Sequence, residues 1–124
     1  MSRPLRAYAG GISLGWQDPG SLRQEAQTYI DAGYRVVKLR VGDTPKREIE
    51  RVAAAREEVG EEIEILVDAN TGSTLDDVRR VMPAYEELGV GWLEEPFPAL
   101  DYRDYALGAA LGSVPLAAGK NLFT

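Results

Sequence analysis

The stretch IEILVDAN, residues 63–70, decides the fold class, because an apolar strand of 63–69 ends there in a polar tip. It stands between two amphipathic segments, 43–60 and 73–89, that predict helices. The alternation extends in both directions. Further strands are predicted at 5–9, 35–41, 90–96 and 114–118, and further helices at 20–34 and 101–112. Strands that alternate with helices predict an α/β fold with a parallel sheet.

The order of these elements is β(αβ)4, within a single domain over residues 1–124. Two architectures accommodate five parallel strands: an open doubly wound sheet, or part of a (β/α)8 TIM barrel. A complete barrel needs about 250 residues. With 124 residues, the chain accounts for about half of a barrel.

Local signals place the helix ends. Ser21 is a candidate N-cap for the first helix, and Gly33 is its expected stop. Thr44 is the candidate cap of the second helix. Thr74 and Asp77 have the spacing of a capping box at the start of the third.

Composition excludes several classes of protein. The net charge of −6 argues against a nucleic-acid binder, which needs a basic face. The chain has no Cys and no His, so thiolate metal sites and the commonest neutral-pH general base are both excluded. No stretch has the roughly 20 apolar residues of a membrane span, and no signal-peptide core begins the chain. We therefore expect a cytoplasmic protein.

Charged side chains gather where the predicted strands end. Lys38 and Arg40 share one face of the strand at 35–41, Asp68 ends the next strand, and Glu94 ends the one after. Active sites of parallel α/β proteins lie at these carboxyl ends. Carboxylates without softer ligands suit Mg2+, and basic side chains beside them suit an acidic substrate. A structural ion pair between the same groups is the alternative interpretation.

Four motifs in register, VVKLRVG (36–42), ILVDAN (65–70), WLEEP (92–96) and AAGKNLFT (117–124), resemble the enolase superfamily. The closest resemblance is to its mandelate racemase and muconate-lactonising branch, and it covers essentially the whole chain. It implies the first half of a catalytic barrel from a family of lyases and isomerases. These enzymes use Mg2+ to remove the proton α to a substrate carboxylate, as acid-sugar dehydratases and racemases do.

The resemblance also assigns roles. It implies that Asp68 and Glu94 are two of three carboxylate metal ligands, and that Lys38 and Arg40 hold the catalytic lysine positions of the family. Lys38 is then expected to hold the substrate carboxylate, because an arginine is a poor base at neutral pH. Supporting positions next to these residues fall at Asn70, Glu95 and Asn121.

The chain departs from the family at the third ligand position, which falls at Lys120. An ammonium opposes a metal cation, so Mg2+ binding is in question, and we expect Lys120 to act as a counter-ion for Asp68 and Glu94. The later strands and the capping domain of the family are absent from the sequence, so we expect little or no turnover by this chain alone.

Two other interpretations remain open. One is a structural or engineered half-barrel without catalysis that forms homo-oligomers through its open edges. The other is a receiver-like phosphoacceptor domain with Asp68 and Lys120 at the ends of its strands, although the end of the predicted first strand lacks the acidic pair that such domains need.

Overall fold

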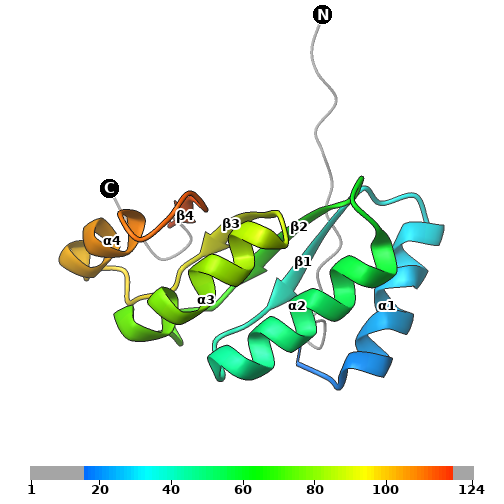
Figure 1. The fold of residues 1–124 in the computed structure, drawn as a ribbon, viewed down its shortest axis with the longest axis horizontal. Helices are drawn as coiled ribbons and strands as arrows, with labels where there is room; N and C mark the ends of the chain where they lie inside the picture. Colours follow the sequence, from blue (N-terminus) through cyan, green and yellow to red (C-terminus); the bar gives the residue numbers. More distant parts are fainter. Residues whose placement is uncertain (1–15, 119–124) are drawn as a thin grey trace, which may run out of the picture.

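The computed structural model describes residues 16–118, which form a parallel sheet with helices between the strands (Figure 1). The elements follow the chain as α1 (Pro19–Asp31), β1 (Val36–Arg40), α2 (Pro45–Val59), β2 (Glu64–Asp68), α3 (Leu75–Glu87), β3 (Val90–Glu94), α4 (Tyr102–Ala109) and β4 (Leu116–Ala117). The four strands pair in the order β1-β2-β3-β4, and all pairs are parallel. The predicted α/β fold is confirmed. The strand predicted at 5–9 lies outside the described residues.

The helices cover one face of the sheet. Alternate strand residues point toward them and are fully buried, and they join residues of α1, α2 and α3 in a single core. The strand side of this core consists of Val37, Leu39, Ile65, Val67 and Leu93, and the helix side includes Leu22, Val52, Val78 and Tyr85. An open doubly wound sheet would have helices on both faces. Cover on one face is the arrangement of a barrel wall, whose other face points inward.

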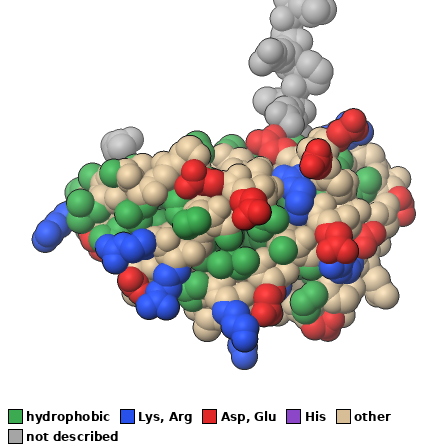
Figure 2. Space-filling model, in the orientation of Figure 1, with side chains coloured by type: hydrophobic (Ala, Val, Ile, Leu, Met, Phe, Trp, Pro, Cys, Tyr) green, Lys and Arg blue, Asp and Glu red, His purple; other side chains and the backbone are tan. Residues whose placement is uncertain are grey.

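The outer surface formed by these helices is mixed in charge. Figure 2 shows acidic and basic side chains scattered over this face, with apolar side chains exposed between them. Within residues 16–118, no helix combines the length and the apolar character that a bilayer crossing requires.

The helix ends show which local signals decided the structure. The Thr44 side chain accepts from Arg47 N at the start of α2, and Thr74 and Asp77 form the predicted capping box of α3. Gly33 follows α1 with φ +99°, a conformation that favours glycine. The prediction of Ser21 as N-cap was wrong: Asp18 caps α1, because Pro19 occupies the first helical turn and Ser21 N donates to Asp18 Oδ1 at 2.9 Å.

One arginine joins the elements at the opposite end of the sheet from the polar strand tips. The Arg56 guanidinium, on α2, donates to the carbonyls of Gly60, Ile63, Leu88 and Gly89 at 2.6–3.3 Å. These carbonyls lie just before β2 and just before β3. A single side chain therefore ties together the two turns through which these central strands begin.

Candidate active site at the carboxyl ends of the strands

Strand register brings the predicted site residues together. Arg40 is paired with Asp68, and Asp68 is paired with Glu94, so the last residues of β1, β2 and β3 form a row. Their neighbours Leu39, Val67 and Leu93 face the helices, so this row lies on the opposite, barrel-facing side. Lys38 is two residues before Arg40 and shares its face. The alternation read from the sequence therefore predicts the correct faces.

Three charged groups meet at one point. The Lys38 Nζ lies 3.3 Å from Glu94 Oε2 and 3.7 Å from Asp68 Oδ2. All three side chains are largely shielded from water, with 12–17% of each exposed. The two carboxylates thus direct oxygens at one cationic position. This geometry matches the ion pair that was the alternative interpretation, and it also defines where a cation would bind.

The environment changes the proton affinity of Glu94. Burial and the adjacent carboxyl of Asp68 raise the pKa of Glu94, and the ammonium of Lys38 opposes that rise. Two carboxylates held this close repel each other when both are ionised. A cation between them relieves this repulsion.

The loops that follow Asp68 and Glu94 contain strained backbone. Asn70, Thr71 and Glu95 have φ values of +47°, +65° and +45°, which non-glycine residues rarely adopt. Asn70 N donates to Asp68 Oδ1 at 2.9 Å, and Thr71 N donates to the carbonyl of Glu95 at 2.6 Å. Such strain persists where surrounding structure enforces it, commonly at functional sites.

The supporting positions differ in their surroundings. Asn70 is exposed, and it supports Asp68 through its backbone N–H. Glu95 is only 2% exposed, so its side chain lies inside the protein and not on the surface. Asn121 and Lys120 lie outside the described residues, so their roles stay predictions.

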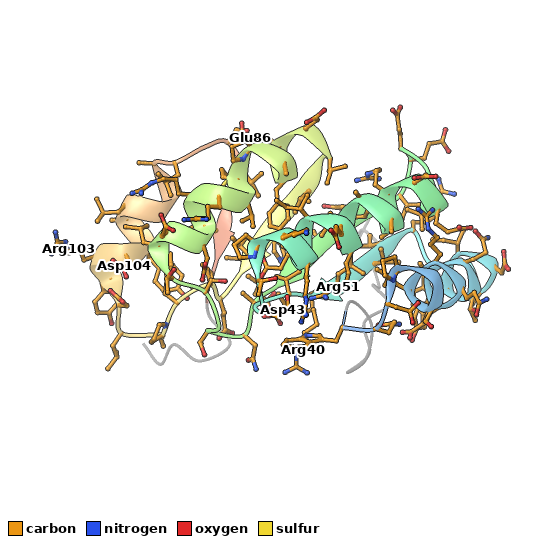
Figure 3. The ribbon with its side chains drawn as sticks, turned by 60° about the horizontal axis from the view of Figure 1, so that its bottom comes forward. Arg40, Asp43, Arg51, Glu86, Arg103 and Asp104 are labelled. Carbon is orange, nitrogen blue, oxygen red and sulfur yellow. The ribbon has the colours of Figure 1, made fainter. Side chains whose placement is uncertain are left out.

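Arg40 does not join the cluster. Figure 3 shows it extending away from the ribbon. Within residues 16–118, its side chain makes no hydrogen bond or ion pair, although the sequence suggested a carboxylate partner.

The donor set fits a hard cation in part. Within the described chain, no group of three His, Cys, Asp or Glu residues could hold a metal ion. Asp68 and Glu94 nevertheless direct two carboxylate oxygens at one point, and Mg2+ is commonly held by one or two carboxylates together with water or substrate. The residues present therefore fit a magnesium ion with two protein ligands.

Sequence reasoning missed a second buried polar cluster, centred on Glu48 of α2. This carboxyl is 3% exposed and contacts Gly42 and Tyr85, and Arg51 pairs with Asp43 beside it at 2.5 Å. The signal that could have revealed it is helical spacing, because Glu48 precedes the buried Val52 by four positions.

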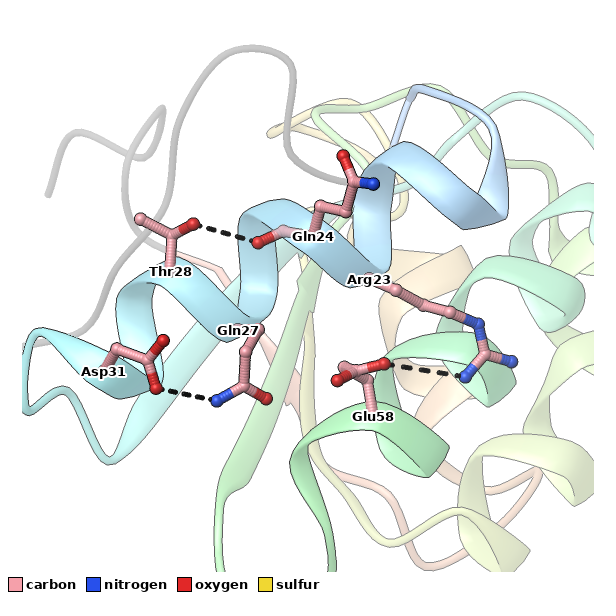
Figure 4. Close-up of a pocket in the computed structure, with 6 residues that line it drawn as sticks. All are labelled: Arg23, Gln24, Gln27, Thr28, Asp31 and Glu58. Atoms are coloured by element: carbon pink, nitrogen blue, oxygen red, sulfur yellow. Dashed lines mark hydrogen bonds and ion pairs between the residues drawn. The ribbon is translucent and has the colours of Figure 1, made fainter.

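A surface pocket lies elsewhere, on helices α1 and α2 (Figure 4). It has a volume of about 310 Å³ and is open to solvent. It is lined by Arg23, Gln24, Gln27, Thr28, Asp31 and Glu58. The dashed lines in Figure 4 include Gln27 to Asp31 at 2.8 Å and Arg23 to Glu58 at 4.0 Å, so its polar groups largely pair with each other. No strand residue lines it, and it is separate from the charged cluster.

A parallel sheet covered by helices on one face, with acid and base side chains at its carboxyl ends, is the architecture of a segment of a (β/α)8 barrel. The comparisons identify the family. The model of the "Enolase C-terminal domain-like" family matches residues 21–124, and the chain belongs to this family. The resemblance to the mandelate racemase and enolase superfamily is thereby confirmed.

Several relatives illustrate the match. The chain is 35% identical to an arabinonate dehydratase of Saccharolobus solfataricus, over 98% of this chain and 33% of the relative. It is 33% identical to an N-succinyl-L-Arg/Lys racemase of Bacillus cereus, over 85% of this chain and 29% of that protein. The chain thus spans about a third of the length of the curated relatives it matches.

Solved structures agree. A member of the enolase superfamily from Polaromonas sp. JS666 is 50% identical, with a TM-score of 0.94 over 98% of this chain and 33% of that one. A racemase from Streptomyces coelicolor, solved with bound magnesium, is 32% identical, with a TM-score of 0.87 over 95% of this chain and 33% of that one.

Proposed function

We propose that this chain forms the part of an enolase-superfamily barrel that holds Mg2+ and the carboxylate of an acidic substrate. In the reaction that we propose, the proton α to that carboxylate is removed, as in a dehydratase or a racemase. The observation that carries the proposal is the convergence of Asp68 and Glu94 on one cationic position beside Lys38. The dehydratase and racemase names of the relatives support the same reaction class.

Each residue has a distinct role in this proposal. Asp68 and Glu94 would hold Mg2+, which would supply positive charge that makes the α-proton of a bound carboxylate more acidic. Lys38 keeps its ammonium within reach of both carboxylates, where it can pair with the carboxylate of an incoming substrate. Burial of all three groups strengthens these interactions by excluding water.

This chain places no group suited to take the α-proton among its described residues at the strand ends. It has no His, an arginine such as Arg40 is a poor base, and the Lys38 Nζ is paired with two carboxylates. We therefore propose that turnover needs groups beyond those of this chain. Hydrogen–deuterium exchange at the α-carbon, followed by proton NMR with sugar acids and N-succinyl amino acids, tests this. Exchange by the chain alone would contradict it.

Lys120, at the third ligand position, serves in this proposal as a built-in counter-ion that weakens Mg2+ binding. The test is calorimetric titration with Mg2+. We expect weak binding by the native chain and at least tenfold tighter binding by Lys120→Glu, because a carboxylate replaces a competing cation. Tight, stoichiometric binding by the native chain would overturn the counter-ion role.

The ligand assignment is tested in the same background. Adding Asp68→Asn to Lys120→Glu should abolish the gain in Mg2+ affinity, because one of the charged ligands of the metal becomes neutral. Adding Glu87→Gln, an exposed change at the end of α3, is the matched control and should leave affinity unchanged. Equal affinity with and without the Asp68 carboxylate would refute the proposed metal site.

Self-association is a second candidate role, favoured by exposed apolar side chains near α4. Leu100, Tyr102 and Leu107 are 78%, 67% and 44% exposed. In the described sheet β4 is an edge strand that pairs only with β3. Exposed apolar groups beside an open strand edge favour pairing with a second copy. Size-exclusion chromatography with light scattering tests this, and a stable monomer at high concentration would exclude it.

A further inference from the structure

The buried carboxyl of Glu48 joins two elements that are distant in sequence. Glu48 Oε1 accepts a hydrogen bond from Gly42 N at 2.6 Å, and Glu48 Oε2 accepts one from the Tyr85 hydroxyl at 3.2 Å. Gly42 belongs to the loop after β1, and Tyr85 belongs to α3. A carboxyl buried to this degree is costly unless such donors satisfy it. The buried Glu48 carboxyl therefore depends on Gly42 and Tyr85 being held in these positions.

Gly42 in turn lies against the loop that follows Asp68. A Cβ at Gly42 would lie 2.5 Å from the Ala69 carbonyl oxygen, and a Cβ at Gly72 would lie 2.8 Å from the Gly42 carbonyl oxygen. Gly42 also has φ +110°, so a side chain there would be strained as well as crowded. The two loops are thus in direct backbone contact, and a shift of one moves the other.

The contact continues to the backbone of both acidic residues of the site. Val41 N donates to the carbonyl of Asp68 at 2.9 Å, and Ala69 N donates to the carbonyl of Glu94 at 2.9 Å. The backbone of Asp68 is therefore tied to the loop after β1, and that of the next residue, Ala69, to the end of β3. The backbone that carries Asp68 has little freedom once Gly42 is held in place.

We propose that Glu48 is a positioning residue, which holds the loop after β1 (residues 41–44) against the loop after β2 (residues 69–74) and thereby keeps Asp68 aligned with Lys38 and Glu94. The significance of this alignment for metal binding rests on the proposed function. The positioning itself stands on the contacts of Glu48, Gly42 and Ala69.

The charges around Glu48 make this connection responsive near neutral pH. Burial and the neighbouring carboxylates of Asp43 and Asp77 raise the pKa of Glu48 to about 7, against the hydrogen bonds from Gly42 and Tyr85. Burial and Glu48 also raise the pKa of Tyr85 well above its usual value, so the hydroxyl of Tyr85 remains a donor.

Arg51 acts electrostatically on Tyr85 and is paired with Asp43. Arg51 is therefore already occupied. A charged carboxylate accepts a hydrogen bond more strongly than a neutral acid. We therefore expect ionised Glu48 to hold Gly42 more firmly than protonated Glu48 does.

Amide NMR across about pH 5 to 9 tests the proposal. In the native chain we expect the amide signals of Gly42, Gly72 and Asn70 to share one transition with a midpoint near 7. The absence of His leaves no ordinary side chain to titrate there. Glu48→Gln should remove the transition at all three amides, whereas Glu50→Gln, an exposed change on the same helix, should keep it.

Glu94 is the other group with a raised pKa, so Glu94→Gln is a necessary control. The shared transition should persist in that variant. If Glu48→Gln does not fold, Tyr85→Phe provides the second test. Loss of the hydroxyl removes a donor to the carboxylate, so the shared midpoint should move upward.

Mg2+ affinity, measured in the Lys120→Glu background, should fall about tenfold on adding Glu48→Gln, a size typical of groups that orient ligands. The positioning role is overturned if Gly42 titrates while Gly72 and Asn70 do not, because the loops would then move independently. If no variant binds Mg2+, the proposed function fails, and the amide transitions still decide the role of Glu48.

Discussion

Replacing Glu48 with Gln should remove the part of the pH dependence of folding stability that comes from this carboxyl. Burial raises the pKa of this carboxyl from 4.5 to about 7 in the folded chain. Between these values the folded state holds a proton that the unfolded state has released. Stability from this group is therefore greatest at low pH and is lost as pH rises through this range. Glutamine has a similar shape, carries no charge and does not titrate, so the variant lacks this loss.

The magnitude follows from the difference between the two pKa values. Each unit corresponds to about 1.4 kcal/mol, so the change from 4.5 to about 7 corresponds to about 3 kcal/mol. The free energy of unfolding of Glu48→Gln, relative to the native chain, should therefore increase by about 3 kcal/mol between about pH 4.5 and pH 8.5. That is a large fraction of the stability of a small domain.

Urea unfolding followed by tryptophan fluorescence, at several pH values, measures this difference directly. Glu50→Gln is the control, since it removes one exposed carboxyl from the same helix. The difference in free energy of unfolding between Glu50→Gln and the native chain should stay nearly constant over this pH range. The assignment of a raised pKa to Glu48 would be refuted if the free-energy difference between Glu48→Gln and the native chain were also constant with pH. A difference that falls as pH rises would refute it as well.

Three further predictions follow from local contacts. Lys38→Met should raise the pKa of Glu94 further, because the ammonium that opposes the rise is lost. Carbon NMR of the Glu94 carboxyl measures this pKa, and an unchanged or lower pKa would contradict the prediction. Gly42→Ala should destabilise the chain by about 2–4 kcal/mol in urea unfolding, because its Cβ would meet the carbonyl of Ala69. Thr74→Ala should cost about 1 kcal/mol through loss of the capping box, and a neutral effect in the same assay would show that α3 does not depend on its cap.

Local signals were sufficient for most of the fold. The caps at Thr44 and Thr74 depend on residues three positions away, so the sequence contains all the information needed. Ser21 was misjudged because Asp18, three residues earlier, also caps well, and Pro19 favours the earlier start. The strand predicted over 114–118 spans only Leu116–Ala117 within the described residues.

The candidate site was predictable where strand alternation governs it. Lys38, Asp68 and Glu94 lie on the face that their spacing indicates, and parallel register brings them together. Arg40 shares that spacing, yet its length carries it away from the cluster, which alternation cannot reveal.

Glu48 was missed for a physical reason. A glutamate in the first turn of a helix usually faces solvent and is stabilised by the helix dipole. Its burial depends on Tyr85, which is 37 residues further along the chain, and on the loop at Gly42. Helical spacing before Val52 indicates only that Glu48 faces the core, and no local pattern specifies its partners at that range.

The guanidinium of Arg56 has a consequence for engineering this scaffold. It fixes the spacing of β2 and β3 from the end of the sheet where they begin, through carbonyls of Gly60, Ile63, Leu88 and Gly89. The polar loops after β2 and β3 lie at the other end. Loop grafts after β2 or β3 can therefore alter those loops while the anchorage of both strands stays intact.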